Sequence, residues 1–456
     1  MKIGIVGWGV EGQSAYRFLG HEHDYLIVNE EPQDNFPPES ARLKVQFIKS
    51  QREPGLTGNV SDLSYLDGID KCDRIIYSVT SAKNLEKKFG GGADFWAKAT
   101  TIQHLFFEEV KTKNIIGVTG TKGKGTTSTL IYELLQAIGK KAWLGGNIGT
   151  AVLDFVREVQ PDDWVVLELS NFQLYNLTYS PRVAVCLMIV PEHLDWHPDM
   201  ADYLEAKANL FRHQKLEDIA IYFAGSEYSA KIAGYSPGHK IPYWQPPGAR
   251  VREDGMIVVE DMPVMDRDGV KLLGEHNLQN ICAAVTAVWF SLSEAEGQVK
   301  IEAMRQVLAS FSGLEHRLEL VRELDGVKYY DDSFATTPET TLVALRALPG
   351  SKVLIVGGHD KGADYEALAD QLLKADIRHV ITLGQVGQRI AERLKSRGFN
   401  SVTENLTDMQ SIVAAARAKA RLGDAVLLSC GTSSFGLFKD YKDRGNQFKQ
   451  AVQELA

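Results

Sequence analysis

Residues 117–127 (GVTGTKGKGTT) combine glycines with lysines and threonines. An apolar pair, residues 115–116, precedes them and a helical pattern begins near Ser128, which gives the order strand, glycine-rich loop, helix. Such a loop points backbone N–H groups and a helix N-terminus at phosphate. Lys124 would add a mobile positive charge for the β- and γ-phosphates of a nucleotide. We therefore predict a nucleoside triphosphate site made by Gly120, Thr121, Lys122, Gly123, Lys124, Gly125 and Thr126.

This loop departs from the strict Walker A pattern at two positions. Val118 stands where the pattern has a glycine five positions before Gly123, and Gly125 follows Lys124 where Ser or Thr is usual. A strand-to-helix turn that binds no ligand therefore stays open as an interpretation of the local pattern.

A second glycine-rich turn lies at the start of the chain. Residues 7–12 (GWGVEG) form a complete G-x-G-x-x-G between a predicted strand and a predicted helix. Asn29 and Glu30 end the next strand, about where a ribose-binding group belongs. Taken alone, the turn suggests NAD or FAD, although any nucleotide diphosphate can use such a loop.

Length and composition limit the possible classes of protein. With 456 residues, 44% of them hydrophobic and 24% charged, the chain is expected to fold into about three globular domains. A net charge of −9 argues against a protein that coats nucleic acid. The four cysteines include no C-x-x-C pair, so we expect reduced, buried thiols rather than a zinc or redox motif.

The pattern of apolar residues predicts neither a membrane span nor a signal peptide. No apolar run reaches the ~18 residues that a span requires, and Met1-Lys2 leads directly into a predicted strand. We expect a cytoplasmic protein without a membrane partner.

Strands alternate with helices along the chain, which predicts an α/β protein with parallel sheets covered on both faces. We expect a Rossmann-like domain at residues 1–100, a central P-loop ATPase-like sheet at 101–312 and a Rossmann-like domain at 313–456. Residues near 240–272 read as β-rich or irregular, and a helix is expected to cover residues 277–290.

Two places in the central series could bind a metal ion. Glu168 ends an apolar strand, where it could hold the magnesium of a nucleotide complex or be an ordinary surface acid. His193 and His197 are four apart, but Leu194 occupies the glutamate position of H-E-x-x-H, so zinc is not expected. One histidine could lie near magnesium, or both could be solvated.

Two further side chains have ordinary default interpretations. Lys207 lies in a short helix and reads as a surface lysine. Asn277 and Asn280 begin an apolar helix, so a capping role is favoured, although an amide pair could also read the edge of an adenine.

Several polar segments of the third series follow predicted strands. They are residues 331–333 (DDS), 357–362 (GGHDKG) and 429–435 (SCGTSSF). Ligands collect at the carboxyl ends of parallel strands, so these segments together predict a site. Arg317, which follows a Gly-Leu turn, could bind a phosphate or form a surface ion pair.

Nine motifs in this order span the whole chain. They lie at residues 119–124, 145–149, 168–174, 192–195, 276–280, 313–317, 332–333, 357–362 and 438–445. Their order and spacing resemble the Mur ligase family, which builds the peptide of peptidoglycan. Residues 168–174 (ELSNFQL) and 360–362 (DKG) resemble the glutamate-adding branch.

This resemblance implies an ATP-dependent, amide-forming ligase that uses Mg²⁺ and acts as a monomer. ATP would phosphorylate the carboxylate of UDP-N-acetylmuramoyl-L-alanine, and the amine of glutamate would attack the acyl phosphate. D-glutamate is favoured, with an L-glutamate-adding variant as the alternative. The chemistry requires charge to be neutralised between two anions, ATP and the carboxylate.

The resemblance also assigns roles to individual residues. Lys124 would bind phosphate, and Asn147 and His193 would lie near the reacting carboxylate. The implied magnesium ligands are Glu168, His193, a carbamylated Lys207 and Thr126. Adenine, phosphate and ribose would contact Asn280, Arg317 and Asp332 respectively. The glutamate pocket would contain Lys361, Ser434, Phe435 and Tyr441. The UDP portion would bind Gly7, Trp8, Gly9, Val10, Glu11, Gly12 and Asn29.

Two departures from the family pattern bear on function. Gly125 removes a hydroxyl that usually binds magnesium, for which Thr126 is the candidate substitute, and Phe334 replaces a lysine in the region that meets the amino acid. The handedness of glutamate therefore stays open. Three other classes remain: a nicotinamide dehydrogenase, a non-catalytic nucleotide-binding protein, and a folate-polyglutamate ligase, which would not need the turn at residues 7–12.

Overall fold

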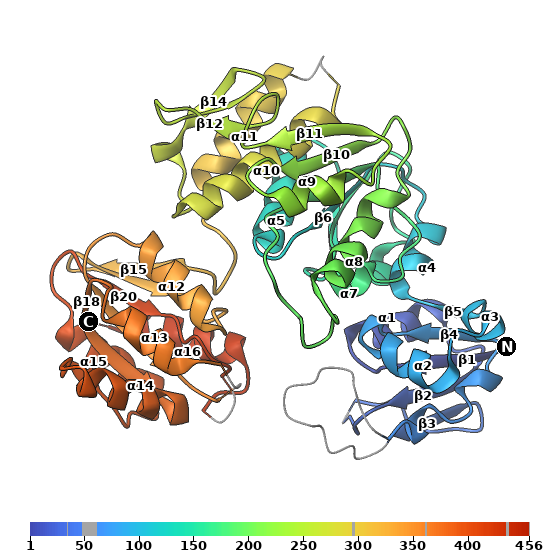
Figure 1. Cartoon of the computed structure of the whole chain (residues 1–456), viewed down its shortest axis with the longest axis horizontal. Coiled ribbons are helices and arrows are strands. Elements are labelled where there is room, and N and C mark those ends of the chain that lie inside the picture. Colours follow the sequence, from blue (N-terminus) through green and yellow to red (C-terminus); the bar gives the residue numbers. More distant parts are fainter. Residues whose placement is uncertain (34, 48–61, 294–296, 361–362, 435–436, 456) are drawn as a thin grey trace. The chain divides into compact units, whose positions relative to one another are not determined.

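The computed structural model describes residues 1–33, 35–47, 62–293, 297–360, 363–434 and 437–455. These residues form two compact units (Figure 1). Unit 1 contains Met1–Gly269 and Gln279–Ala309, and unit 2 contains Val270–Leu278 and Ser310–Ala456. The α/β class with parallel sheets is confirmed, whereas the three-domain boundaries stay a prediction.

The first sheet of unit 1 contains five parallel strands in the order β3-β2-β1-β4-β5. The strands are β1 (Lys2–Val6), β2 (Asp24–Asn29), β3 (Leu43–Phe47), β4 (Arg74–Tyr77) and β5 (Ala99–Thr100). Helix α1 (Val10–Leu19) packs on one face, where Ile3, Ile5 and Phe18 belong to the same buried hydrophobic cluster. The other face is covered by η1 (Ser64–Leu66), η2 (Ile69–Lys71), α2 (Ala82–Phe89) and α3 (Ala93–Trp96), and η3 (Val79–Ser81) connects β4 to α2.

The turn between β1 and α1 requires glycine at particular positions. Gly7 has a φ of 93°, which a residue with a side chain rarely adopts. A Cβ at Gly12 would lie 2.0 Å from the carbonyl oxygen of Gly7, whereas a Cβ at Gly9 would meet nothing within 4 Å. The backbone therefore approaches itself closely at Gly12 and leaves open space at Gly9.

The second sheet of unit 1 has six parallel strands in the order β11-β10-β9-β6-β8-β7. They are β6 (Ile115–Thr119), β7 (Ala142–Gly146), β8 (Trp164–Glu168), β9 (Val183–Cys186), β10 (Ile219–Phe223) and β11 (His239–Tyr243). Strand β6 lies inside the sheet and is buried on both faces. Parallel strands of this kind are continuous apolar runs, which explains why the sequence indicated β6 and β8.

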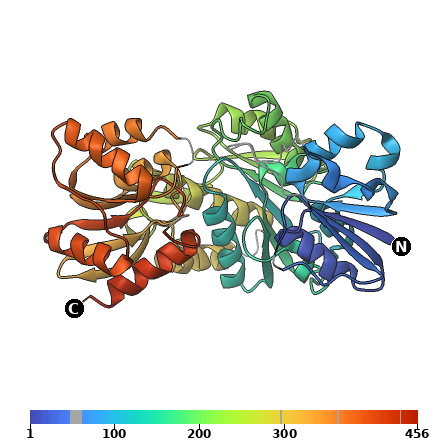
Figure 2. The same cartoon turned by 90° about the horizontal axis from the view of Figure 1, so that it is seen from below.

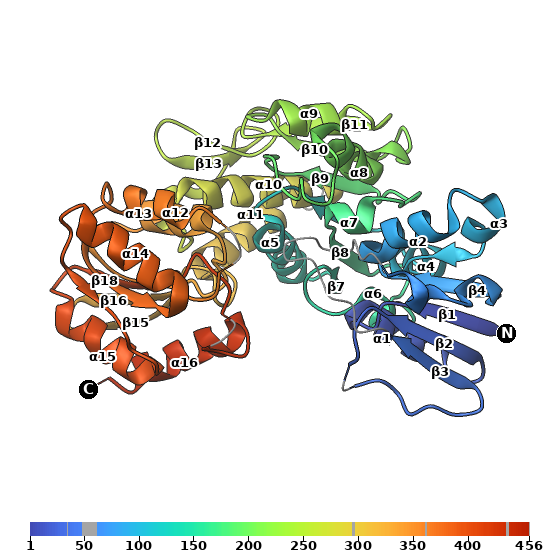
Figure 3. The same cartoon turned by 60° about the horizontal axis from the view of Figure 1, so that its bottom comes forward.

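Helices surround this sheet. They are α4 (Ile102–Glu109), α5 (Lys124–Ala137), α6 (Val152–Phe155), α7 (Asn171–Leu174), α8 (Met200–Arg212), α9 (Glu227–Ala233), α10 (Glu275–Ser291) and α11 (Gly297–Ser310). Helices α8 and α9 lie next to each other beside the sheet (Figure 3). The segment that read as β-rich forms an antiparallel sheet of β12 (Arg250–Val251), β13 (Met256–Val259) and β14 (Met262–Asp266), followed by η4 (Arg267–Gly269).

Unit 2 contains one sheet of six strands in the order β15-β16-β20-β17-β18-β19. They are β15 (Glu319–Leu324), β16 (Val327–Asp331), β17 (Lys352–Gly357), β18 (Ile377–Leu383), β19 (Val402–Thr403) and β20 (Ala425–Leu428). Only β15 runs antiparallel, at the edge. The sheet separates α12 (Pro338–Ala347), α13 (Tyr365–Leu372) and α14 (Gly384–Ser396) from α15 (Met409–Lys419) and α16 (Tyr441–Gln453), as Figure 2 shows.

Two further expectations can be compared with the structure. All four cysteines are buried and free. Over the part of the chain that the structure describes, no helix has the length and apolar character that crossing a bilayer requires.

The glycine turn of the first sheet gives a test of its own geometry. We expect Gly12→Ala to lower the free energy of unfolding by about 3 kcal/mol, because the added methyl group would overlap a backbone oxygen. Gly9→Ala is the matched control and should change it by less than ~0.5 kcal/mol. Urea unfolding followed by circular dichroism measures both. Equal stability of the two variants would contradict the close approach at Gly12.

Candidate functional site

The loop between β6 and α5 has the geometry of a phosphate-binding turn. Gly120 and Gly123 have φ values of 148° and 88°, and Gly123 lies directly before the first residue of α5. The ammonium group of Lys124 donates to the carbonyl oxygens of Gly120 and Thr121, each at 2.9 Å. The loop therefore holds the lysine charge at the N-terminus of a helix, where anions are favoured.

Lys207 is buried, so its default interpretation as a surface lysine was wrong. It is 1% exposed on α8, and its ammonium group donates to the carbonyl oxygen of Gly120 at 3.0 Å. Burial, reinforced by the charge of Lys124, lowers the pKa of Lys207 to about 7. Helical periodicity could not place this side chain, because its partner lies 87 residues away in sequence.

Glu168 and Asn147 form a pair at the carboxyl ends of β8 and β7. Glu168 is 4% exposed, which excludes the surface-acid interpretation. The side-chain amide of Asn147 donates to Oε1 of Glu168 at 2.8 Å, and its backbone N–H donates to the Glu168 carbonyl oxygen at 2.8 Å. Gly146 permits this approach, since a Cβ there would lie 2.2 Å from the same carbonyl oxygen. The carboxylate is thus held in one orientation through one of its oxygens.

The two histidines of residues 192–197 have different environments. His197 is buried between the Asn171 amide, 2.8 Å from Nε2, and the Asp202 carboxylate, 2.6 Å from Nδ1. His193 adopts a φ of 57° and has a side chain that is 41% exposed. Burial lowers the pKa of both histidines, which favours the neutral imidazole that binds metal ions. His197 therefore has a structural role, and His193 stays the candidate ligand.

Other loop residues are tied to their surroundings. The Thr121 hydroxyl donates to the Val190 carbonyl oxygen at 3.0 Å and lies 3.0 Å from the Tyr203 hydroxyl. Lys122 forms an ion pair with Glu192. The sequence did not predict the contacts of Thr121 with Val190 and Tyr203, because neither partner was a candidate site residue.

Thr126 and Asn280 are both buried near the start of α5. Thr126 lies in the first turn of the helix, one residue after Gly125. Helix α10 begins at Glu275, so Asn277 and Asn280 lie inside it and the expected capping role was wrong. A Cβ at Gly123 would lie 2.2 Å from Oδ1 of Asn280. The Asn280 amide is thus packed against the phosphate loop.

The first glycine turn and the Asn147 region line one cavity of about 390 Å³. Its lining includes Gly9, Val10, Glu11, Gly12, Gly146, Asn147, Ser170 and Phe172. Gln173 donates to the Glu11 carboxylate at 2.9 Å. A neighbouring cavity of about 210 Å³ is lined by Gly7, Gly9 and Asn29, among others. The structure thus brings the predicted nucleotide turn and Asn147 together.

The side chains of Trp8 and Val10, both in this turn, have different environments. The backbone N–H of Trp8 donates to Oδ1 of Asn29 at 2.9 Å, while the Trp8 ring is buried against Tyr16 and Phe36. Val10, in contrast, is largely exposed. The Trp8 side chain therefore supports the turn through its packing, and its backbone N–H ties the turn to Asn29.

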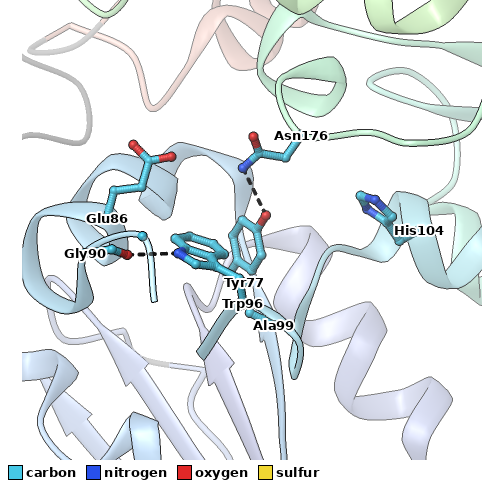
Figure 4. A pocket seen from close by; sticks show the side chains of 8 residues that line it. Tyr77, Glu86, Gly90, Trp96, Ala99, His104 and Asn176 are labelled. Atoms are coloured by element: carbon cyan, nitrogen blue, oxygen red, sulfur yellow. Dashed lines mark hydrogen bonds between the residues drawn. The ribbon is translucent and has the colours of Figure 1, made fainter. Parts of the chain in front are cut away.

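Another cavity lies away from these residues. A space of about 610 Å³ is lined by Tyr77, Glu86, Gly90, Gly91, Trp96, Ala99, His104 and Asn176 (Figure 4). The Asn176 amide donates to the Tyr77 hydroxyl, and the Trp96 indole N–H donates to the Gly90 carbonyl oxygen. None of the predicted phosphate-binding residues lines it, so this cavity is not the predicted nucleotide site.

In unit 2, Asp332 and Arg317 lie near the end of β16. The Asp332 carboxylate accepts from the Ser429 hydroxyl at 2.8 Å and the Leu318 backbone N–H at 3.1 Å, and burial raises its pKa to about 7. The guanidinium of Arg317 lies 3.8 Å from the ring centroid of Phe334. Phe334 therefore places its ring face against the arginine.

The predicted glutamate pocket is only partly described. Ser434 is buried, and the Tyr441 ring meets Phe334 edge-on at 5.1 Å. Lys361 and Phe435 lie outside the described residues.

A buried arginine that received no role from the sequence supports this region. Arg444 is 1% exposed and donates to the hydroxyl and carbonyl oxygens of Ser333 at 2.9 and 2.8 Å. Beside it, His316 lies 2.7 Å from the Asp331 carboxylate, and Asp331 also accepts the Ser333 N–H. Arg444 falls in the last quoted motif, which was the available signal.

Comparison with known proteins identifies the family. Residues 118–288 match the Mur ligase middle domain, and residues 316–431 match the Mur ligase, glutamate ligase domain. The UDP-N-acetylmuramoylalanine–D-glutamate ligase of Clostridium kluyveri is 33% identical over 100% of this chain and 97% of its own length. The chain belongs to the Mur ligase family. The Acetivibrio thermocellus protein of the same name is 36% identical over 78% of both chains.

Solved Mur ligases share the fold. The UDP-N-acetylmuramate-alanine ligase MurC of Thermotoga maritima has a TM-score of 0.57 at 17% identity and covers 99% of both chains. The MurF ligase of Thermotoga maritima, solved in complex with ADP, has a TM-score of 0.57 at 18% identity, covering 86% of this chain and 92% of its own. The sequence predicted an amide-forming ligase of the Mur ligase family, and this prediction is confirmed.

The burial of Lys207 predicts a dependence of stability on pH. The folded-state pKa of about 7 lies below the ordinary value of 10.5. Below pH 7 the Lys207 amine is protonated in both the folded and the unfolded protein, and the folded protein bears the full cost of burying this charge. Between pH 7 and 10.5 the amine keeps its proton only in the unfolded protein. The destabilisation that results from burying the Lys207 charge therefore decreases as pH rises.

Lys207→Met removes this titration. We expect the free energy of unfolding of the variant to exceed that of the unchanged protein. The difference should be largest near pH 6, on the order of a few kcal/mol, and smaller at pH 9. Urea unfolding in buffers free of carbon dioxide measures it, with exposed Lys113→Met as the control. A pH-independent difference would contradict the lowered pKa.

Proposed function

We propose that this chain is an ATP-dependent ligase that joins glutamate to UDP-N-acetylmuramoyl-L-alanine in the synthesis of peptidoglycan precursors. The observation that carries the proposal is the meeting of Lys124 and Lys207 at the Gly120 carbonyl oxygen, on a glycine-rich loop at the start of α5. Relatives that match most or all of the chain are named for this reaction. Their names favour D-glutamate.

The cavities of unit 1 support a place for the UDP-linked substrate that is separate from the glycine-rich loop of residues 117–127. Gly7 to Gly12 and Asn29, together with Asn147, are proposed to bind the UDP-linked substrate along the cavities of about 390 and 210 Å³. The loop N–H groups and Lys124 are proposed to bind the β- and γ-phosphates of ATP. Asn280, packed against Gly123, is proposed to contact the adenine.

The donor set fits a magnesium ion. Glu168 offers a buried, oriented carboxylate, and His193 offers an imidazole whose lowered pKa favours the neutral form. Thr126 replaces, one position later, the hydroxyl that Gly125 lacks. When bound, magnesium would supply charge neutralisation between the phosphates and the substrate carboxylate.

Lys207 is proposed to become a further, anionic ligand by carbamylation. Because burial lowers its pKa to about 7, the amine can lose its proton near neutral pH. The neutral nitrogen can add to carbon dioxide, forming an N–C bond and releasing a proton to water. The product would exchange a buried cation for an anion beside Lys124.

The reaction then requires two steps. The substrate carboxylate takes the γ-phosphoryl group of ATP and ADP leaves. The glutamate amine attacks the resulting acyl phosphate, loses a proton, and phosphate leaves as the amide forms. Lys124 and the loop stabilise the charge on the transferred group. In unit 2, Arg317 and Asp332 are proposed to bind phosphate and ribose, and Lys361, Ser434, Phe435 and Tyr441 to bind glutamate.

Phosphate release tests the proposal directly. With ATP, Mg²⁺, UDP-N-acetylmuramoyl-L-alanine and D-glutamate we expect release that depends on all four. L-glutamate alone supporting turnover would transfer the proposal to the other enantiomer. If no phosphate is released with either D-glutamate or L-glutamate, the ligase assignment is contradicted.

Lys124→Ala should lower kcat by at least ~100-fold, because the phosphates lose a charge-assisted donor. Lys113→Ala, an exposed lysine just before the same strand, is the control and should keep full activity. An unchanged rate in the Lys124 variant would contradict the phosphate-loop assignment.

Lys207→Ala should be nearly inactive and partly recover when short carboxylic acids are added, since these can replace the carbamate. Full activity without added acid would contradict the carbamate. Phosphate release measured at increasing acetate concentration, for the variant and for the unchanged protein, shows both the loss of activity and its recovery.

A further inference from the structure

Lys83 connects the first sheet of unit 1 to the turn that holds His193. It lies in the first turn of α2, and its ammonium group donates to the carbonyl oxygen of Trp196, 113 residues later. The same group lies 3.9 Å from the centroid of the Trp196 ring. One cation therefore holds both the backbone and the side chain of this residue.

The Trp196 ring is buried inside an aromatic cluster. It meets Phe172, Tyr175 and His197 edge-on, with ring centroids 5.1, 4.9 and 4.7 Å apart. Its indole N–H has no hydrogen-bond partner among the residues that the structure describes. The position of the ring therefore depends on these packed faces and on Lys83.

Trp196 is also part of the turn itself. The backbone N–H groups of Trp196 and His197 both donate to the carbonyl oxygen of His193, at 3.0 and 2.9 Å. The His193 ring lies 4.9 Å from that of Phe172, which lines the cavity beside Asn147. A shift of Trp196 would therefore move the backbone that sets the direction of the His193 side chain.

Most attachments of this turn come from the central sheet and its helices. Asn171 and Asp202, which hold His197, belong to α7 and the start of α8. Lys83 belongs instead to the first sheet and follows residues 78–81, which line the two cavities near the first glycine turn. The turn is thus fixed from both sheets of unit 1.

We propose that Lys83 is a positioning residue: it holds the turn of residues 193–197 so that the place of His193 depends on the segment lining the UDP-substrate cavity. Its consequence for catalysis rests on the proposed function. The contact of Lys83 with a carbonyl oxygen and a ring, rather than with a carboxylate, distinguishes it from an ordinary surface ion pair, which contributes little.

Amide hydrogen exchange tests the positioning without any catalytic readout. In Lys83→Met, which keeps the aliphatic stem, we expect the peptide covering residues 190–199 to exchange at least ~10-fold faster. Lys83→Arg, which retains a donor and a cation for the ring, should restore protection. Exposed Lys87→Met, one turn further along the same helix, is the control. Lys83→Gln replaces the Met variant if the latter does not fold.

Kinetics with the same proteins tests the consequence. Lys83→Met should lower kcat roughly 10-fold with the KM for ATP within about twofold of its original value, and Lys83→Arg should recover most of the rate. Unchanged exchange in Lys83→Met would overturn the positioning role. Faster exchange with an unchanged kcat would overturn its link to the reaction. If the unchanged protein itself has no ligase activity, the proposed function fails, while the exchange result still decides the contact.

Discussion

Two lysine ammonium groups donate to one carbonyl oxygen, that of Gly120. Burial of Lys207 disfavours its charged form and the nearby charge of Lys124 adds to this cost, so the pKa of Lys207 falls to about 7. A bound phosphate, or a carbamate on Lys207, would remove much of this cost. The resting protein therefore carries an unfavourable concentration of positive charge that anionic ligands relieve.

The fold brings the required groups to this point by strand order. Strand β6 lies between β8 and β9 in a fully parallel sheet, so the ends of all three strands reach the same edge. Gly120 directly follows β6, Glu168 is the last residue of β8, and the segment leading to His193 follows β9. Two polar groups of the site are oriented by hydrogen bonds, Glu168 by the Asn147 amide and Lys207 by the Gly120 carbonyl oxygen. Such fixed orientation is what electrostatic catalysis requires.

The sequence could predict the glycine turns and the strands because both depend on local properties. Gly12 and Gly120 stand where a side chain would meet backbone or a neighbouring strand, and an apolar run identifies β6 without further information. The environment of Lys207 could not be predicted in this way, because a helical lysine looks the same on a surface and against a distant loop. Asn280 was read as a cap for the same reason: its partner Gly123 is remote in sequence.

Phosphorylation of the substrate carboxylate at this site can be followed with an isotope. The carboxylate of UDP-N-acetylmuramoyl-L-alanine is labelled with oxygen-18, and the phosphate released during turnover with ATP and glutamate is analysed. We expect one oxygen-18 atom to be transferred to each phosphate, because the carboxylate oxygen that accepts the phosphoryl group leaves with it. Phosphate without the label would show that ATP is hydrolysed by water and would contradict the acyl-phosphate route.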